Sequence, residues 1–177
     1  DRTAKTLIEQ IDTLTKIANE FSNFAVMPKA DEQKIEILPV IETTVDLFSK
    51  TIKNITLTNK CSSEILIVCD KDQISRVFNN LIKNSLQAIP PEREPKIEVI
   101  LQEKDNKLLI SVKDNGAGIQ NNQKDKIFVP NFTTKSTGMG LGLAMVKNIV
   151  EAANGVIWFE TTENKGTTFF IEFPLAP

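Results

Sequence analysis

Apolar residues in the first 27 positions recur at alternating steps of four and three residues. The positions are Leu7, Ile11, Leu14, Ala18, Phe21 and Ala25. This 3.5-residue period is that of a coiled-coil seam, and it predicts one amphipathic helix that ends at Pro28. Such a seam packs either on its own domain or on other helices, and the heptad regularity favours other helices.

From residue 33 onward the pattern changes to short strands that alternate with helices. Strands are expected at 34–38, 55–59, 65–69, 96–103, 107–113, 156–162 and 167–173, and helices at 39–50, 71–89 and 141–153. Asp70 is the expected N-cap of the second helix, and residues 114–140 lack periodicity and are expected to form a loop.

Because the strands fall into antiparallel hairpins with three helices between them, we expect an α+β fold. It is a two-layer α/β sandwich, in which helices cover one face of a mixed, mostly antiparallel sheet, preceded by one N-terminal helix. The expected domains are therefore 1–28, the N-terminal helix, and 33–177, the sandwich.

Composition narrows the functional classes. Lys and Arg total 21 against 23 Asp and Glu, so the net charge is −2, and no long basic run suggests nucleic-acid binding. No apolar stretch approaches the roughly 18 residues of a membrane-spanning helix, so no membrane contact by this part of the protein is expected. Cys61 and Cys69 lack metal-ligand spacing and are expected to be reduced thiols in the cytoplasm. The chain contains no histidine.

The helix expected at 71–89 carries a narrow polar stripe. Its members are Gln73, Arg76, Asn80, Asn84 and Gln87. The simplest interpretation is the solvent-facing side of an amphipathic helix. Asparagine is a poor residue in helix interiors, however, and its amide can offer oxygen to a hydrated Mg²⁺ and nitrogen to a phosphate. Asn80 and Asn84 are therefore candidates for a metal and phosphate site.

The segment Asp114-Asn115-Gly116-Ala117-Gly118 directly follows an expected strand. A carboxylate at a strand end can accept a hydrogen bond from the amino group of adenine, and glycines let the backbone pass close to a flat base. The same residues also form a favoured turn, so this segment alone does not decide between the two interpretations.

The segment Gly138-Met139-Gly140-Leu141-Gly142 opens the last expected helix. Backbone N–H groups at a helix start attract phosphate, and Lys135, three residues upstream, is a cation suited to a terminal phosphate. A flexible glycine hinge is the alternative. A dinucleotide-binding fingerprint fits badly, because neither a parallel βαβ unit nor a ribose-binding acid follows.

In this order, the segments resemble the N, G1, F and G2 boxes of the sensor histidine kinase catalytic domain, within the GHKL ATPase superfamily. The matching residues are 80–88, 114–119, 128–135 and 138–143. The compact 132–135 run resembles the short ATP lid of kinases related to nitrogen-regulation sensors. Residues 11–28 resemble the second helix of the dimerisation and phosphotransfer hairpin. The resemblance implies a GHKL-type sandwich at 33–177, preceded by part of that hairpin at 1–28.

The resemblance also implies roles for single residues. Asn84 corresponds to the Mg²⁺-binding asparagine, Asn80 and Lys135 to residues that meet the phosphates, and Asp114 to the aspartate that reads adenine. Further contacts with ATP are implied for Gly116, Gly118, Phe132, Thr134, Gly138, Gly140, Leu141 and Gly142. Phe128 and Phe132 would anchor the lid. Ser85, Gln87 and Ala88 depart from the family, which often has Ala at the first position and frequently Lys or Tyr at the others.

The implied activity is transfer of the ATP γ-phosphate to a histidine in a two-component system. Because this chain has no histidine, the acceptor is expected on a helix outside this sequence, and this piece is expected not to phosphorylate itself. The implied partners are ATP with Mg²⁺, a second copy through the N-terminal helix, and the receiver domain of a response regulator through the complete kinase. The complete kinase could be anchored in the inner membrane, with this part in the cytoplasm.

Two alternatives stay open at this point. A standalone GHKL ATPase or an anti-sigma serine kinase would use the same pocket but would need no phosphotransfer helix. A regulatory module would bind nucleotide or a partner without catalysis. The complete set of pocket residue types disfavours this second alternative.

Overall fold

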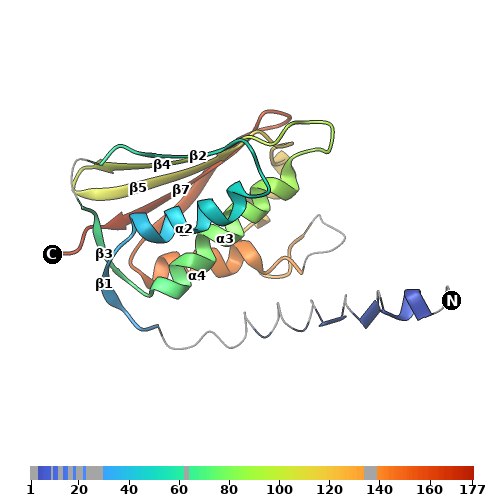
Figure 1. The fold of residues 1–177 in the computed structure, drawn as a ribbon, viewed down its shortest axis with the longest axis horizontal. Helices are drawn as coiled ribbons and strands as arrows, with labels where there is room; N and C mark the ends of the chain where they lie inside the picture. The colour runs from blue at the N-terminus through green and yellow to red at the C-terminus, as the bar shows by residue number, and fades with distance from the viewer. Residues whose placement is uncertain are drawn as a thin grey trace.

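The fold comes from a computed structural model that describes residues 4–8, 10–11, 14–15, 18, 22, 30–61, 64–133 and 139–177. Within these residues, one sheet of five strands is covered on one face by three helices (Figure 1). The molecule therefore has the two layers that the sequence predicts.

The five-stranded sheet has the order β2-β4-β5-β7-β6. Its strands are β2 (Ile55–Asn59), β4 (Ile97–Lys104), β5 (Lys107–Asp114), β6 (Val156–Thr162) and β7 (Gly166–Pro174). Only the pairing of β2 with β4 is parallel among these, and the other three pairings are antiparallel. The expectation of a mixed, mostly antiparallel sheet is confirmed.

Alternation along the strands explains why one face of this sheet is covered. The inward positions are buried residues in register across the sheet: Val99 pairs with Val112, which pairs with Phe169. Burial of a large apolar side chain stabilises the folded state by about 1.5–3 kcal/mol. These rows therefore fix the face on which the helices pack.

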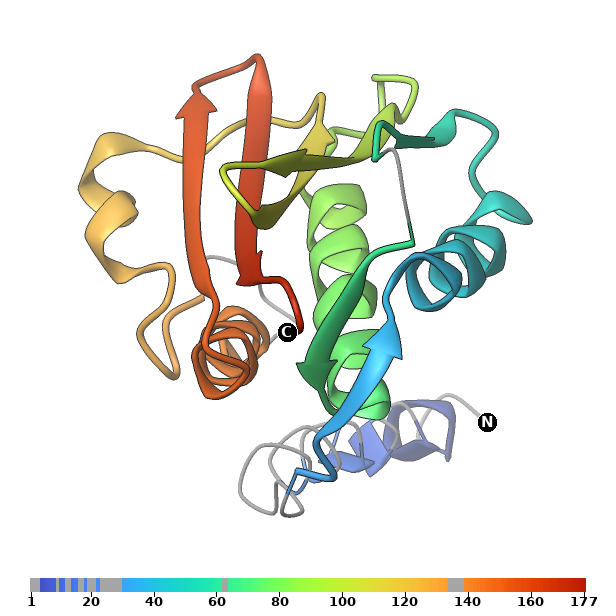
Figure 2. The same cartoon turned by 90° about the vertical axis from the view of Figure 1, so that its left-hand side faces the viewer.

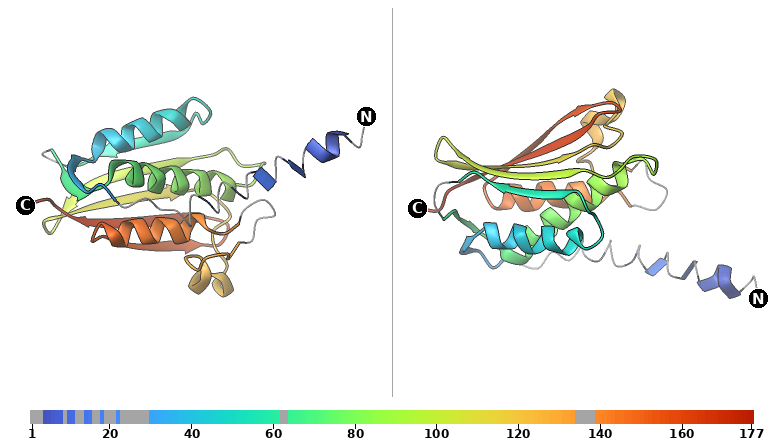
Figure 3. Two further views of the ribbon diagram at one scale, coloured as in Figure 1. Left: turned by 90° about the horizontal axis from the view of Figure 1, so that it is seen from below. Right: turned by 45° about the horizontal axis from the view of Figure 1, so that its top comes forward.

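The covering helices are α2 (Leu38–Ser49), α3 (Lys71–Ala88) and α4 (Gly142–Ala152). They lie beside one another beneath the sheet, with α3 between the other two (Figure 3). The apolar face of α3 is wholly buried and is formed by Ile74, Val77, Phe78, Leu81 and Ile82. As predicted, Asp70 caps α3, because its side chain accepts hydrogen bonds from the backbone N–H groups of Asp72 and Gln73.

A second, two-stranded sheet stands at the N-terminal end of α3 (Figure 2). It pairs β1 (Gln33–Glu36) with β3 (Leu66–Cys69) in antiparallel register. The strand expected at 34–38 starts one residue too late and ends two residues too late, because α2 already begins at Leu38, with Pro39 in its first turn. The expected loop at 114–140 was also wrong in part, since Asn121–Lys126 form a 3₁₀ helix, η1.

Within 4–22, every residue that the structure describes is helical. Leu7, Ile11 and Leu14 are each about 60% exposed, so the described part of the expected seam has no cover within this chain. Phe21, Ala25 and Pro28 lie outside the described residues. None of the described helices combines the length and apolar character needed to cross a membrane.

Candidate nucleotide site

Asp114 is a buried acid at the end of β5, with an exposed fraction of only 3%. Its Oδ1 accepts hydrogen bonds from the backbone N–H of Gly116 at 2.8 Å and of Thr167 at 3.1 Å. A buried carboxylate held by backbone donors has a fixed direction, which is what recognition of one amino group on a flat base requires.

The loop after Asp114 is seated on the C-terminal end of α3. The Ala117 N–H donates to the carbonyl oxygen of Ala88 at 2.8 Å. A Cβ added at Gly116 would lie 2.7 Å from that same oxygen, so only glycine lets the loop approach the helix this closely. Gly118 has a φ of +74° and meets the backbone of Thr162, which excludes other residues on both counts.

Asn80 and Asn84 face the start of α4. The side-chain nitrogen of Asn80 donates to the carbonyl oxygen of Arg76, one turn earlier, at 2.8 Å. A Cβ added at Gly142 would lie 2.9 Å from Oδ1 of Asn80 and 3.8 Å from Nδ2 of Asn84. The two amides and the first residue of α4 are therefore neighbours, as the sequence predicts.

The start of α4 has the features of an anion site. Leu141 stands at the N-cap and supplies no side-chain hydrogen bond, and the first turn contains no acid. The positive end of the helix dipole is therefore not neutralised by the helix's own side chains. Leu141 itself is buried, with 6% exposure, so its side chain packs into the protein. Its contribution toward a ligand would come through the backbone.

These groups lie along one helix. Asn80 and Asn84 are in the middle of α3 and meet α4, whereas Ala88 at its end meets the loop that follows Asp114. Eight residues separate Asn80 from Ala88, which is about 12 Å along a helix axis. The amide pair and the loop that carries Asp114 are thus held at opposite ends of the same two turns.

Two phenylalanines hold the segment between Asp114 and α4 against the domain. The ring of Phe128 packs edge-on to Phe159 and Phe169, at centroid distances of 6.1 and 6.4 Å, and the Lys147 ammonium lies 5.9 Å from its centre. Phe132 is partly buried against the core, and a Cβ on Gly140 would overlap its backbone. Lys135, Thr134 and Gly138, also predicted as site residues, lie outside the described residues.

Sequence reasoning assigned no individual role to three residues that hold Asp114 and the loop after it. Thr167 supplies a backbone N–H to Asp114, and Arg93 and Asn115 fasten the loop after Asp114 to the segment before β4. A backbone N–H carries no residue-specific signal. The only local hint was the glycine before Thr167, which marks a turn.

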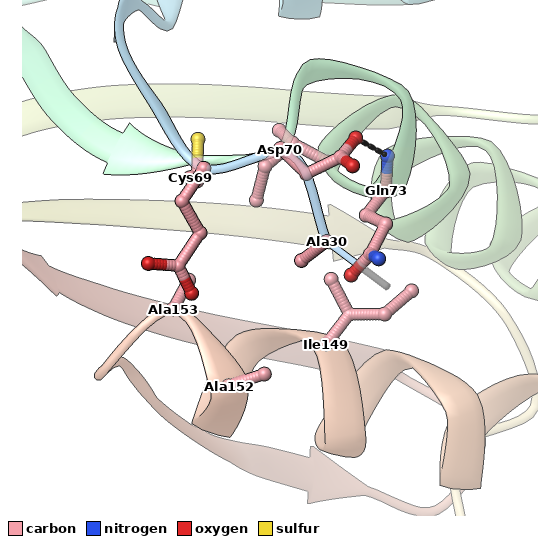
Figure 4. Close-up of a pocket in the computed structure, with 9 residues that line it drawn as sticks. Ala30, Cys69, Asp70, Gln73, Ile149, Ala152 and Ala153 are labelled. Atoms are coloured by element: carbon pink, nitrogen blue, oxygen red, sulfur yellow. Dashed lines mark hydrogen bonds between the residues drawn. The ribbon is translucent and has the colours of Figure 1, made fainter. Parts of the chain in front are cut away.

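Two hollows in the described part of the chain have none of Asn80, Asn84, Asp114 and Gly142 in their lining, although the first includes Gly118. One, of about 310 Å³, is lined by Ala117, Gly118, Gln120, Gln123, Glu163 and Asn164, on the β6–β7 side of the loop after Asp114. The other, of about 10 Å³, lies between β3, α3 and α4, beside Cys69, Asp70 and Gln73 (Figure 4). The second has room for a single water and no ligand. Burial there raises the pKa of the Cys69 thiol to about 12, with Asp70 and Glu32 adding to the effect.

The donor set can be tested against Mg²⁺. Among the described residues, no cluster of three His, Cys, Asp or Glu side chains could hold a metal by itself. Nucleotide-bound Mg²⁺ keeps most of its waters and needs few protein oxygens, so the amide oxygens of Asn80 and Asn84 beside the start of α4 are of a type that fits it.

A family model described as histidine kinase-, DNA gyrase B-, and HSP90-like ATPase matches residues 69–177, more than half of the chain. The chain belongs to this ATPase family. The matched range contains Asn80, Asn84, Asp114 and Gly142, so these four candidate site residues are all within the ATPase region.

Relatives of this ATPase domain are sensor kinases. The sensor protein kinase WalK of Staphylococcus haemolyticus is 31% identical over 94% of this chain. A putative NtrY-like sensor histidine kinase of Rickettsia typhi is 32% identical over 97% of this chain. The chain spans 29% of the length of each of these two relatives.

Solved structures agree with the ATPase fold. The catalytic domain of histidine kinase ThkA is 32% identical, with a TM-score of 0.70 over 81% of this chain and 95% of that one. A structure of ThkA in complex with the response regulator TrrA is 26% identical, with a TM-score of 0.71 over 98% of this chain and 49% of that one. The fold expected from the sequence, a GHKL-type sandwich, is confirmed.

Proposed function

We propose that this chain is the ATP-binding catalytic part of a two-component sensor histidine kinase, and that it presents the γ-phosphate of ATP to a histidine outside this sequence. The observation that carries the proposal is that Asn80 and Asn84 on α3 face Gly142, while the loop after Asp114 is seated on the end of the same helix. Their chemistry matches adenine at one end of the helix segment and phosphate at the other.

Base recognition is assigned to Asp114. Its carboxylate accepts a hydrogen bond from the adenine amino group, while Gly116 and Gly118 keep the loop close to the ring. Discrimination against guanine follows, because guanine presents a carbonyl oxygen where adenine presents an amino group. The partial negative charge of that oxygen would be repelled by the carboxylate.

Phosphate positioning is assigned to Asn80, Lys135 and the backbone at Gly140–Gly142, with Thr134 and Gly138 completing the lid. Phosphoryl transfer needs little covalent chemistry from the protein, so catalysis is mainly alignment of the γ-phosphate with the incoming imidazole nitrogen. The P–O bond to ADP breaks as the new P–N bond forms, and the acceptor's proton leaves to a base outside this chain. Asn84 would hold Mg²⁺, which neutralises charge on the phosphate oxygens when bound.

The proposed partners follow from the same assignment. A second copy would pack on the exposed seam of Leu7, Ile11 and Leu14, and the complete kinase would pass the phosphoryl group to a response regulator receiver domain. ThkA, a structural relative, has been seen with such a regulator.

Calorimetry with ATP, purine riboside triphosphate and adenosine tests the base and metal assignments. The Asp114→Asn variant is expected to lose about 10- to 100-fold in ATP affinity, the effect of a hydrogen bond to a charged group, and to lose little for purine riboside triphosphate, which lacks the amino group. Asn84→Asp is expected to disturb Mg²⁺-dependent ATP binding more than adenosine binding. Equal ATP affinity in wild type and Asp114→Asn would overturn the base assignment.

Radiolabelled ATP tests the activity itself. The chain alone is expected to retain no label, whereas a separately made hairpin that carries the acceptor histidine should become labelled when the chain is added. A hairpin variant with the histidine replaced by glutamine is the control. Acid-stable label on serine would instead support the anti-sigma alternative.

A further inference from the structure

The segment between α3 and β4 grips the loop that follows Asp114. A turn closed by the Arg93 N–H and the Pro90 carbonyl, 2.9 Å apart, brings the Arg93 side chain to that loop. There, Nη1 of Arg93 donates to two successive carbonyl oxygens, those of Asn115 at 2.5 Å and of Gly116 at 2.8 Å.

Each of these carbonyls belongs to a peptide unit whose N–H makes a contact important to the site. The Asn115 carbonyl shares its planar unit with the Gly116 N–H, which donates to Oδ1 of Asp114. The Gly116 carbonyl shares its unit with the Ala117 N–H, which donates to Ala88 at the end of α3. Because a peptide unit is rigid and planar, holding the oxygen also sets the direction of the N–H.

One guanidinium nitrogen therefore orients two peptide planes. Its charge also polarises both units, and polarised amides are stronger donors at their other end. The donor that fixes the Asp114 carboxylate and the donor that ties the loop to α3 thus both depend on Arg93.

Other residues of the segment between α3 and β4 also hold this loop, but through the side chain of Asn115. The Asn115 side chain accepts from the Lys96 N–H and donates to the Glu94 carbonyl, both at 2.9 Å. The Glu94 side chain accepts from the Asn54 amide at 2.7 Å, just before β2. These contacts fasten the loop's first residue to the segment before β4, whereas Arg93 binds the carbonyl oxygens of the next two peptide units.

We infer that Arg93 is a positioning residue for nucleotide recognition, acting on Asp114 through the peptide unit between Asn115 and Gly116. This inference rests on the proposed role of Asp114. It assigns Arg93 no contact with ATP. Its effect is to hold the carboxylate in the direction that distinguishes adenine from bases that lack its amino group.

The test is a comparison of affinities for ATP and for purine riboside triphosphate, measured by calorimetry on the full chain. In Arg93→Ala, the preference for ATP is expected to fall about three- to tenfold, the equilibrium effect of losing one hydrogen bond, with the analogue's affinity nearly unchanged. Arg93→Lys should recover part of the preference, because an ammonium can still donate to carbonyl oxygens.

Lys96→Ala is the matched control. It removes one positive charge from the same segment but keeps the backbone N–H that Asn115 uses, and it leaves the neighbouring Glu98 with Lys113 as a partner. The ratio of its affinities for ATP and for purine riboside triphosphate is expected to equal that of the wild type. A fall as large as that of Arg93→Ala would show a general charge effect and overturn the inference.

Amide hydrogen exchange provides a readout without nucleotide. In Arg93→Ala, exchange at Gly116 and Ala117 should accelerate while the amides of β4 and β5 keep their protection, and the latter also verifies folding. Unchanged exchange at Gly116 and Ala117 would overturn the inference.

The outcomes separate this inference from the proposed function. If Asp114→Asn loses the preference for ATP and Arg93→Ala keeps it, only the role of Arg93 is wrong. If the wild-type chain shows no preference for ATP over the analogue, the proposed base recognition fails, and Arg93 loses its role in recognition with it.

Discussion

Gly142 on α4 faces Asn80 on α3 so closely that a Cβ on the glycine would stand 2.9 Å from the amide oxygen. The atom in its way is the end of a side chain, which can rotate, and not backbone. A substitution at this point should therefore move the proposed phosphate-binding amide without breaking the fold.

The Gly142→Ala variant tests this separation of binding from stability. Alanine is the better helix former, so the free energy of unfolding should change by less than about 1 kcal/mol. The displaced Asn80 amide should weaken ATP binding about fivefold or more, the scale of one hydrogen bond to a charged group. Asn148→Ala, on the exposed side of α4, is the control for helix propensity and should leave ATP affinity alone. An ATP affinity of Gly142→Ala equal to that of the wild type would show that the position of the Asn80 amide beside Gly142 has no part in ATP binding.

Gly166 should behave in the opposite way. Its φ is +120°, and a Cβ there would overlap the backbone carbonyl of Asp114. Because the obstacle is backbone, Gly166→Ala should lower the free energy of unfolding by about 1–3 kcal/mol, measured by urea denaturation. Lys165→Ala, at the preceding exposed turn position, should stay close to wild type. Matching denaturation midpoints for the two variants would contradict this account.

Ser85 follows Asn84 on α3 and carries a buried hydroxyl without a hydrogen-bond partner among the described residues. A buried polar group left unpaired costs about 1–3 kcal/mol, so Ser85→Ala should raise the free energy of unfolding, by up to about 1 kcal/mol after the lost packing is counted. Ser75→Ala is the control, since that hydroxyl donates to Lys71 and is accessible to solvent. Thermal denaturation of both variants measures the difference; a less stable Ser85→Ala would mean that the hydroxyl has a partner in solution.

Because of Asp70, the free energy of unfolding should depend on pH. Burial opposes its ionisation, but the backbone N–H groups of Gln73, Asp31 and Asp72, with Arg76 nearby, outweigh burial and lower the pKa of this carboxyl. A carboxyl whose pKa is lower in the folded chain stabilises the fold above the unfolded value of about 3.9 and loses that contribution as pH falls through the folded value.

Asp70→Asn keeps an acceptor at the helix cap but removes the charge. The variant should therefore be less stable than wild type at pH 6–7, and the gap in free energy of unfolding should shrink as pH falls below about 4. Urea denaturation across this range measures the gap. Asp46→Asn, an exposed acid on α2, is the control for loss of one negative charge. A gap that stays constant with pH would rule out the ionised cap as its source.

Local patterns in the sequence predicted most of the helices and strands, because period and capping are properties of neighbouring residues. Asp70 as the cap of α3 and the hairpin of β6 with β7 are examples. Local patterns do not predict which strands pair when they are distant in sequence. Nothing near β2 indicates that it pairs in parallel with β4, and nothing near β3 indicates that it pairs with β1. The helix η1 lacks apolar residues at a helical period, so its Asn and Lys residues suggested a loop.

The site divides along similar lines. Asn80, Asn84, Asp114 and Gly142 could be predicted as site residues because their side chains, or the lack of one, carry the expected chemistry. Thr167 and Arg93 were missed for a physical reason. The first contributes a backbone N–H that every residue but proline has, and the second binds backbone carbonyls that every residue has.

The hydrogen bond from Thr167 to Asp114 joins residues 53 positions apart. During synthesis, therefore, the carboxylate acquires its second donor only after β7 has left the ribosome and docked on β5. Until then the nascent chain lacks the hydrogen bond from Thr167 to this carboxylate. Nucleotide binding should consequently be among the last properties that the growing polypeptide gains.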